Sequence, residues 1–169
     1  MQSKKITLNK ISKLVLIVLI ICTLAFIWGN SLQDASSSLA ASERVFEFLK
    51  PMLELFLGVG NVTIGFVRKL AHFVEFGLLG CELAMLSLLY KRHRWKDFAV
   101  CLGCGLAVGA VDETIQIFTG RGAQVKDVLL DFSGALCGVT IVFTIRYIVC
   151  MTKKRGKKRT TQSSAHRNY

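Results

Sequence analysis

The chain has 169 residues, of which 52% are hydrophobic and 20% are charged, and 22 Lys and Arg against 11 Asp and Glu give it a net charge of +11. Soluble domains are usually about 45–50% apolar and about 25% charged, so this chain is unusually apolar and unusually basic. Apolar spans with basic cytoplasmic flanks account for both properties. The composition therefore favours a membrane protein, argues against a soluble nucleic-acid-binding domain, and excludes a secreted disulfide scaffold, a coiled coil and a disordered regulator.

Four apolar segments are expected to cross a membrane as helices. A helix needs about 20 mostly apolar residues to cross about 30 Å of hydrocarbon. The last three segments reach this length, and the first can be extended through Leu8 and Ile11. The basic stretch before the first segment is also typical of a signal peptide, but no small-residue cleavage site follows, so we expect this helix to be retained. The predicted spans are residues 14–30, 70–90, 98–118 and 128–150.

The distribution of Lys and Arg predicts the orientation of the spans. Most of these residues fall before the first span, between the second and third spans, and after the fourth span. Because cytoplasmic loops attract Lys and Arg, and because an even number of spans leaves both chain ends on one side, we expect both termini in the cytoplasm. We expect residues 1–13 to form a basic N-terminus, and residues 151–169 a basic, disordered tail that is attracted to anionic lipid rather than to nucleic acid.

The connection between the first two spans contains a further helix. Residues 31–42 are small and polar, which is typical of a loop. Apolar residues then recur at helical spacing over residues 43–57, which predicts an amphipathic helix with Ser42 as its N-cap. We expect Pro51 to weaken or kink this helix and Gly58 to end it. The helix should lie on the bundle or in the interface plane on the outer side, and a partner-binding element is the alternative.

Polar and ionisable side chains gather at the outer ends of spans two, three and four. The antiparallel arrangement of the spans brings these ends to one level. An ionisable group within a span costs about 2.5–3.5 kcal/mol on insertion. Several of them at one depth therefore predict a site, in which they pair with one another, with water or with a ligand. We expect this site to contain Lys69, His72, Glu75, Asp112, Glu113, Gln116, Arg121, Asp127 and Asp131.

Glycines continue two of these helix faces toward the other end of the bundle. Asp112 shares a face with Gly109, and Asp131 shares a face with Gly134 and Gly138. Small residues let membrane helices approach closely. We therefore expect the fourth span to pack tightly on a neighbour at Gly134 and Gly138.

The residue types leave the chemistry of the site open. Carboxylates and imidazole could bind a divalent cation, but the charges nearly balance without one, and we predict no metal. A general acid–base site is a second alternative, with the catalytic candidates His72, Glu75, Asp112, Glu113 and Asp127. The basic residues could instead hold a lipid phosphate. The cluster could also be structural, since His72 and Glu75 could pair and Asp127 is favoured by a helix N-terminus.

The order of these residues resembles the VanZ-like family. The matching elements are Lys69-x-x-His72-Phe73-x-Glu75-Phe76, Asp112-Glu113-x-x-Gln116, Gly120-Arg121, Asp127, Gly134-x-x-x-Gly138, and Asn30-Ser31-x-Gln33 after the first span. The resemblance covers about residues 14–150, and Asp131 departs from it, because an amide is often found there. It implies a small bacterial membrane protein whose family namesake is associated with resistance to the glycopeptide teicoplanin. It implies no particular reaction.

We therefore expect an all-α integral membrane bundle of four transmembrane helices, with one extra amphipathic helix on the outer side, in the bacterial cell membrane. We expect it to bind the headgroup of an outer-leaflet lipid or glycolipid and, through the resemblance, to contribute to glycopeptide resistance. A membrane enzyme acting on a lipid headgroup and a structural partner protein without a ligand are the alternatives. We expect no cofactor, with a divalent cation as the alternative, and no nucleic-acid partner.

Overall fold

The computed structural model describes residues 2–90, 94–122 and 124–165, with the backbone alone for 2–8, 94 and 156–165. These residues form five helices and no strand. Four of the helices are long and apolar enough to cross a membrane, which confirms the predicted bundle with one extra helix. The helices are α1 Gln2–Ser31, α2 Ala35–Leu57, α3 Ile64–Leu89, α4 Arg94–Phe118 and α5 Val125–Ala165.

Each of the four spans begins earlier than hydropathy predicted, and the first and the last also end later. The second span begins earlier because Thr63 caps α3, its hydroxyl oxygen accepting a hydrogen bond from the backbone N–H of Phe66 at 3.1 Å. Lys69 therefore lies inside α3 and not before it. The spans run over Asn9–Ser31, Ile64–Leu89, Trp95–Phe118 and Val125–Arg155.

The extra helix is longer than the sequence pattern indicated. α2 begins at Ala35, so the loop predicted over residues 31–42 is wrong for most of its length. The predicted N-cap, Ser42, lies inside the helix, where its hydroxyl donates a hydrogen bond to the carbonyl oxygen of Ser38 at 2.8 Å. This bond satisfies a serine hydroxyl within a helix, and the alanines of the segment favour helix. The residue at the N-cap is Asp34.

The ends of α2 and α5 were predicted with different success. α2 continues through Pro51. It ends before Gly58, as predicted, and the φ of Gly58 is 87°, which glycine adopts readily. α5 continues to Ala165, so the disordered tail predicted over residues 151–169 is wrong as far as the structure describes it. Lys and Arg have good helix propensity, and this segment extends a helix that the span has already nucleated. Residues 166–169 lie outside the described residues.

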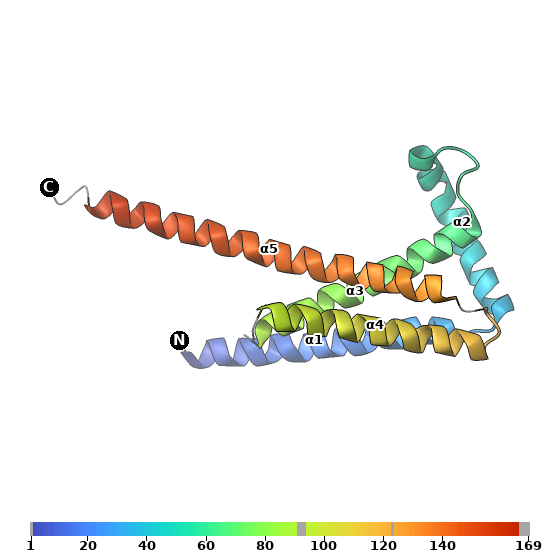
Figure 1. Cartoon of the computed structure of the whole chain (residues 1–169), viewed down its shortest axis with the longest axis horizontal. Helices are drawn as coiled ribbons and strands as arrows, with labels where there is room; N and C mark the ends of the chain where they lie inside the picture. The colour runs from blue at the N-terminus through green and yellow to red at the C-terminus, as the bar shows by residue number, and fades with distance from the viewer. Residues whose placement is uncertain (1, 91–93, 123, 166–169) are drawn as a thin grey trace.

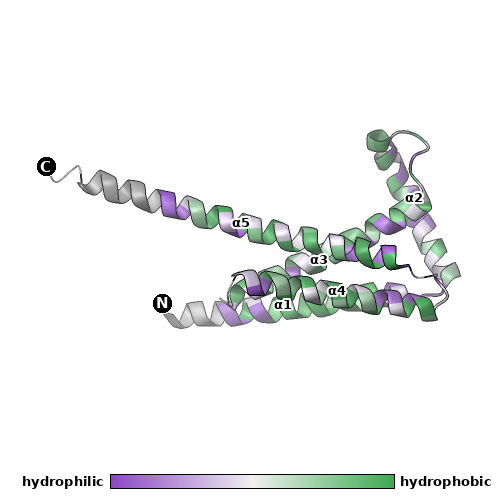
Figure 2. Ribbon diagram, viewed as in Figure 1, coloured by the Kyte–Doolittle hydropathy of each residue, from purple (hydrophilic) through white to green (hydrophobic). Residues whose placement is uncertain are grey.

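α3 is the central helix of the bundle. It packs most extensively against α5 and also contacts α1, α2 and α4. The beginning of α1 and the far part of α5 lie toward one end of the molecule, and α2 lies across the opposite end (Figure 1). Figure 2 shows hydrophobic residues along the middle of the four spans. We refer to the end at which α2 lies as the α2 end.

Two clusters of buried apolar side chains hold the spans together. Ile27 of α1 and Phe76 and Leu79 of α3 are fully buried against one another. The second cluster joins α3, α4 and α5 through Ala84, Cys101 and Val139. Many other apolar side chains of the spans are exposed in the isolated chain, as expected for surfaces that face lipid.

The contact between α3 and α5 depends on glycine. A Cβ atom at Gly134 would overlap the carbonyl oxygen of Phe73, and one at Gly138 would overlap the carbonyl oxygen of Gly77. The thiol of Cys81 donates a hydrogen bond to the carbonyl oxygen of Gly138 at 3.5 Å. The two backbones therefore touch along this stretch, which confirms the predicted close packing and identifies α3 as the neighbour.

Substitution of Gly138 tests this contact. Gly138→Ala should lower the free energy of unfolding by about 1–3 kcal/mol, because the added methyl group meets the backbone at Gly77 and would push α3 away from α5. Gly103→Ala is the matched control, since a Cβ atom there has nothing within 4 Å and should leave stability unchanged or raise it. Thermal melting in detergent measures both variants. An unchanged melting temperature for Gly138→Ala would contradict the close contact.

Candidate functional site

The predicted site residues come together near the α2 end of the bundle. α3 and α4 each supply three of them, α5 supplies two, and the loop between α4 and α5 supplies one. Helical spacing places the members from each helix on the surface that faces the other helices. We call the following residues the polar cluster: Lys69, His72, Glu75, Asp112, Glu113, Gln116, Arg121, Asp127 and Asp131.

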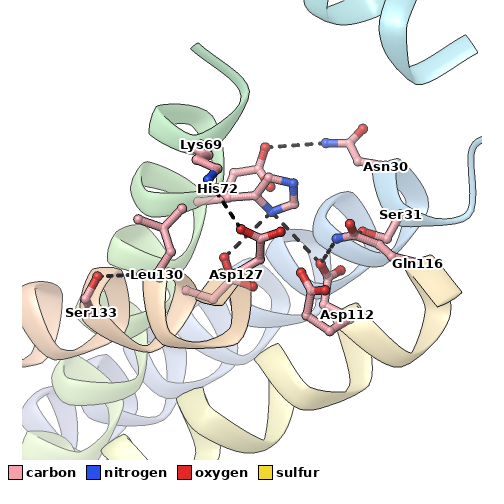
Figure 3. Close-up of polar contacts among 12 residues, drawn as sticks. Asn30, Ser31, Lys69, His72, Asp112, Gln116, Asp127, Leu130 and Ser133 are labelled. Carbon is pink, nitrogen blue, oxygen red and sulfur yellow. Dashed lines mark hydrogen bonds and ion pairs between the residues drawn. The ribbon is translucent and has the colours of Figure 1, made fainter. Parts of the chain in front are cut away.

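His72 lies at the centre of the polar cluster. Its Nδ1 atom is 3.9 Å from Oδ2 of Asp112 (Figure 3). The same nitrogen is 3.8 Å from Oδ1 of Asp131. Both carboxylates are buried, with exposed fractions of 0% for Asp112 and 1% for Asp131. α3, α4 and α5 thus each direct one side chain to the same point inside the bundle. One ligand atom from each residue lies within 4.8 Å of the other two, so the three could share a proton or a cation.

Gln116 holds one of these carboxylates in place. It lies one turn after Asp112 on α4, and its side-chain amide donates a hydrogen bond to Oδ2 of Asp112 at 2.7 Å (Figure 3). The same amide nitrogen lies 3.4 Å from the hydroxyl oxygen of Ser31 at the end of α1. Gln116 is buried, so these bonds form a buried polar network that ties α4 to α1.

Glu75 is directed toward α1. Its Oε1 atom accepts a hydrogen bond from the side-chain amide of Asn30 at 3.5 Å. The pairing of Glu75 with His72 that their spacing allowed is not found among the described residues. The other carboxylate oxygen of Glu75 is buried and has no hydrogen-bond partner in the part of the chain that the structure describes. It is therefore free to bind a ligand.

Arg121 joins the loop between α4 and α5 to the end of α1. Its Nη1 atom donates a hydrogen bond to the backbone carbonyl oxygen of Asn30 at 2.7 Å. Its backbone N–H donates to the carbonyl oxygen of Gln116 at 3.0 Å. Burial lowers the pKa of the Arg121 guanidinium below its ordinary value, and the positive charge of Arg68 lowers it further. The group still carries its charge at neutral pH.

The remaining charged members lie at the edge of the cluster. Glu113 accepts a hydrogen bond from the backbone N–H of Gln124 at 3.2 Å and so holds the loop that leads into α5. Nζ of Lys69 lies 3.8 Å from Oδ1 of Asp127 (Figure 3). The Lys69 side chain is 56% exposed, so this ion pair contributes little to stability.

A cavity of about 210 Å³ lies between α1, α2 and α3. We call it the α2-side cavity. One part of its wall is apolar and comes from all three helices, with Phe26, Val45 and Val67 as examples. The other part is polar and consists mainly of Asn30, Arg68, His72, Glu75 and Arg121. The cavity therefore offers both charged groups and apolar surface to a ligand.

A second, much smaller cavity lies on the side of His72 that faces α4 and α5. Its volume is about 10 Å³, and we call it the small polar cavity. Such a volume is about the space that one water molecule needs. Its walls consist of Arg68, Lys69, His72, Glu113, Gln116, Asp127, Leu130 and Asp131.

Two further residues, Arg68 and Asn30, belong to this site and were not predicted from the sequence. Arg68 lines both cavities. The signal that could have found it is its position four residues before His72, which places both on one helix face. Asn30 bonds to both Glu75 and Arg121. Its only signal in the sequence was its place in the short polar pattern that follows the first span.

Of the comparisons with known proteins, the one with family models gave a match. The curated proteins and the solved structures gave no match to the chain. The family model described as VanZ/LLP1 matches residues 16–146, which are most of the chain. The matched segment runs from α1 into α5 and includes every member of the polar cluster, in agreement with the resemblance in the sequence. The chain therefore belongs to the VanZ/LLP1 family.

Proposed function

We propose that this multi-pass membrane protein binds the phosphate-bearing headgroup of an outer-leaflet lipid or glycolipid in the α2-side cavity. We also propose that it thereby contributes to resistance to glycopeptides of the teicoplanin type. The composition of the cavity wall is the main support, because two arginines, a histidine and a carboxylate stand opposite an apolar surface. A lipid combines a charged headgroup with an apolar body, so its chemistry matches both parts of the wall.

Arg68 and Arg121 give the cavity its positive charge. Guanidinium groups bind phosphate oxygens through paired, charge-assisted hydrogen bonds. Nε of Arg121 is buried and has no hydrogen-bond partner among the residues that the structure describes. This atom is therefore a donor that a bound phosphate could use. Asn30 and Glu75 lie on the same wall, where they could bond to hydroxyl or amino groups of the headgroup.

α2 supports a position of the cavity at the level of lipid headgroups. Phe48, Leu55 and Phe56 are 83%, 80% and 79% exposed, so α2 presents a large apolar surface outside the bundle. Amphipathic helices with such a surface lie in the membrane interface. α2 also forms one wall of the cavity, in part through Val45. A headgroup in the adjacent leaflet would therefore lie beside the cavity.

The proposal requires the α2 end to face outward. The opposite end carries basic residues, among them Lys10, Lys13, Lys153, Lys154 and Arg155. Cytoplasmic segments of membrane proteins attract Lys and Arg. We therefore place both termini in the cytoplasm and the protein in the bacterial cell membrane.

An enzyme that acts on the headgroup is the second candidate. One observation favours it: His72 lines the α2-side cavity and faces two buried carboxylates, which suits general acid–base catalysis. Purified protein incubated with a radiolabelled bacterial lipid extract would give new products in chromatography if it were an enzyme, and His72→Ala would abolish them. Recovery of unaltered lipid would support binding alone.

Loss of the cavity arginines should reduce lipid binding. Arg68→Gln and Arg121→Gln should each lower the amount of phosphate-bearing lipid that co-purifies with the protein, by about tenfold, because each removes a charge-assisted hydrogen bond. Mass spectrometry of lipid extracts from protein in mild detergent measures this amount. Arg44→Gln is the matched control, since Arg44 is exposed on α2 and does not line the cavity. Equal lipid in all three variants would contradict the proposal.

The same variants test the proposed role in resistance. A susceptible bacterium that expresses the unchanged protein should need a higher teicoplanin concentration for growth inhibition. Arg68→Gln should lose this protection and Arg44→Gln should keep it, at equal expression. Protection by Arg68→Gln at the level of the unchanged protein would separate resistance from headgroup binding.

An impermeant thiol reagent tests the orientation. The starting protein is a variant in which the six native cysteines are replaced. Val59→Cys should react in intact cells, because Val59 is 87% exposed in the connection between α2 and α3. Gly156→Cys should react only after the cells are permeabilised. The reverse pattern would place the polar cluster on the cytoplasmic side and would rule out an outer-leaflet ligand.

A further inference from the structure

We infer that His72, Asp112 and Asp131 bind one divalent transition-metal ion, of the class that includes Zn²⁺ and Mn²⁺. The inference goes beyond the proposed function, because Asp112 and Asp131 do not line the α2-side cavity and metal binding requires no lipid. It rests on the convergence of three donors, on buried atoms that lack partners, and on the charge that surrounds them.

The three donors lie close to the separation that a metal ion imposes. Nδ1 of His72 is 3.9 Å from Oδ2 of Asp112 and 3.8 Å from Oδ1 of Asp131. A metal ion with ligands at about 2.1 Å holds neighbouring ligand atoms about 3.0–3.4 Å apart. These two distances exceed this range by less than about 1 Å, and all three ligand atoms lie within 4.8 Å of one another, so small side-chain rotations would bring them to the required separation. Because each donor comes from a different helix, the packing of the spans builds the site in advance.

Three polar atoms of these residues lack partners in the part of the chain that the structure describes. Nδ1 of His72, Oδ1 of Asp112 and Oδ2 of Asp131 are buried and have no hydrogen bond to any residue that the structure describes. Buried polar atoms are normally satisfied, and each exception needs an explanation. A metal ion bound by both carboxylates and by the imidazole nitrogen would explain why these atoms have no other partner.

Over the whole polar cluster the charges nearly balance, but Asp112 and Asp131 have no cation of the cluster beside them, and a bound metal ion would neutralise them. Asp112 and Asp131 are buried close together, and two carboxylates in such surroundings are costly unless a cation or a proton neutralises them. Two basic members of the polar cluster are engaged elsewhere: Lys69 lies 3.8 Å from another carboxylate, and Arg121 donates to a backbone carbonyl oxygen at 2.7 Å. A divalent cation with neutral His72 brings the net charge of the three-residue site to zero.

The donor set indicates which class of metal would bind. Ca²⁺ and Mg²⁺ take oxygen ligands, whereas imidazole suits Zn²⁺ and neighbouring transition metals, and carboxylates also suit Mn²⁺. Gln116 holds the Asp112 carboxylate through a hydrogen bond of 2.7 Å, as outer partners of metal ligands do. The small polar cavity, of about 10 Å³, gives space for one water molecule as a further ligand.

Direct metal titration tests the inference. Protein purified in mild detergent without a polyhistidine tag is stripped with a chelator, and Zn²⁺ and Mn²⁺ are titrated separately by calorimetry, with elemental analysis after gel filtration. The unchanged protein should bind one equivalent of at least one of these ions. Asp131→Asn should weaken the affinity by about tenfold or more, because the amide keeps the size but loses the charge of the ligand.

A matched control separates metal binding from a general effect of buried acids. Glu82→Gln removes a buried carboxylate of α3 that lies outside the polar cluster, where it accepts a hydrogen bond from Thr23 at 3.0 Å. This variant should bind metal like the unchanged protein. Gel filtration first shows that every variant elutes as the same species as the unchanged protein. If Asp131→Asn fails to fold, His72→Gln replaces it, since it removes the ligand from α3.

Two outcomes would overturn the inference. The first is equal metal affinity in the unchanged protein, Asp131→Asn and His72→Gln. The second is no binding of either ion by the unchanged protein, which would mean that a proton shared between the carboxylates neutralises them. The measurement contains no added lipid, so it is separate from the proposed function. Metal binding that persists in Arg68→Gln while lipid is lost would show that metal binding does not require bound lipid.

Discussion

The close approach of α3 and α5 is the constraint on which the rest of the structure depends. Gly134 lets the backbone of α5 touch the carbonyl group of Phe73. His72 directly precedes Phe73, and Asp131 lies three residues before Gly134 on the same helix face. The contact that packs the helices therefore also places the imidazole and this carboxylate 3.8 Å apart. Packing and site geometry cannot be changed separately here, because any side chain that separates the helices also separates the two groups.

A second constraint is that polar groups at membrane depth need partners. The carbonyl oxygens in the last turn of α1 have no partners within their own helix. Arg121 donates to the carbonyl oxygen of Asn30 at 2.7 Å, and the hydroxyl of Thr119 donates to that of Ser31 at 3.1 Å. The loop between α4 and α5 thus supplies hydrogen-bond donors to the carbonyl groups at the end of α1. The same bonds fix Arg121 at the wall of the α2-side cavity, so one set of contacts serves both stability and the site.

Hydropathy and spacing predicted the spans and the polar cluster, because both depend on which residues share a depth and a helix face. They could not predict which side chains pair. Glu75 and His72 have the spacing of a pair, yet Asn30 takes Glu75, and the rotation of α1 that brings Asn30 there is a property of the assembled bundle. The start of α2 was missed because residues 35–42 are small and polar and show no apolar stripe. Arg68 was missed because a basic residue before an apolar run is typical of a membrane flank.

Arg68 and His72 connect the α2-side cavity with the small polar cavity. Both side chains line the α2-side cavity and the small polar cavity, so they belong to the walls of both. A charge bound in one cavity would therefore alter the electrostatic surroundings of the other, because both contain the same two side chains. We expect binding in either cavity to change the affinity of the other, and by the same factor in both directions.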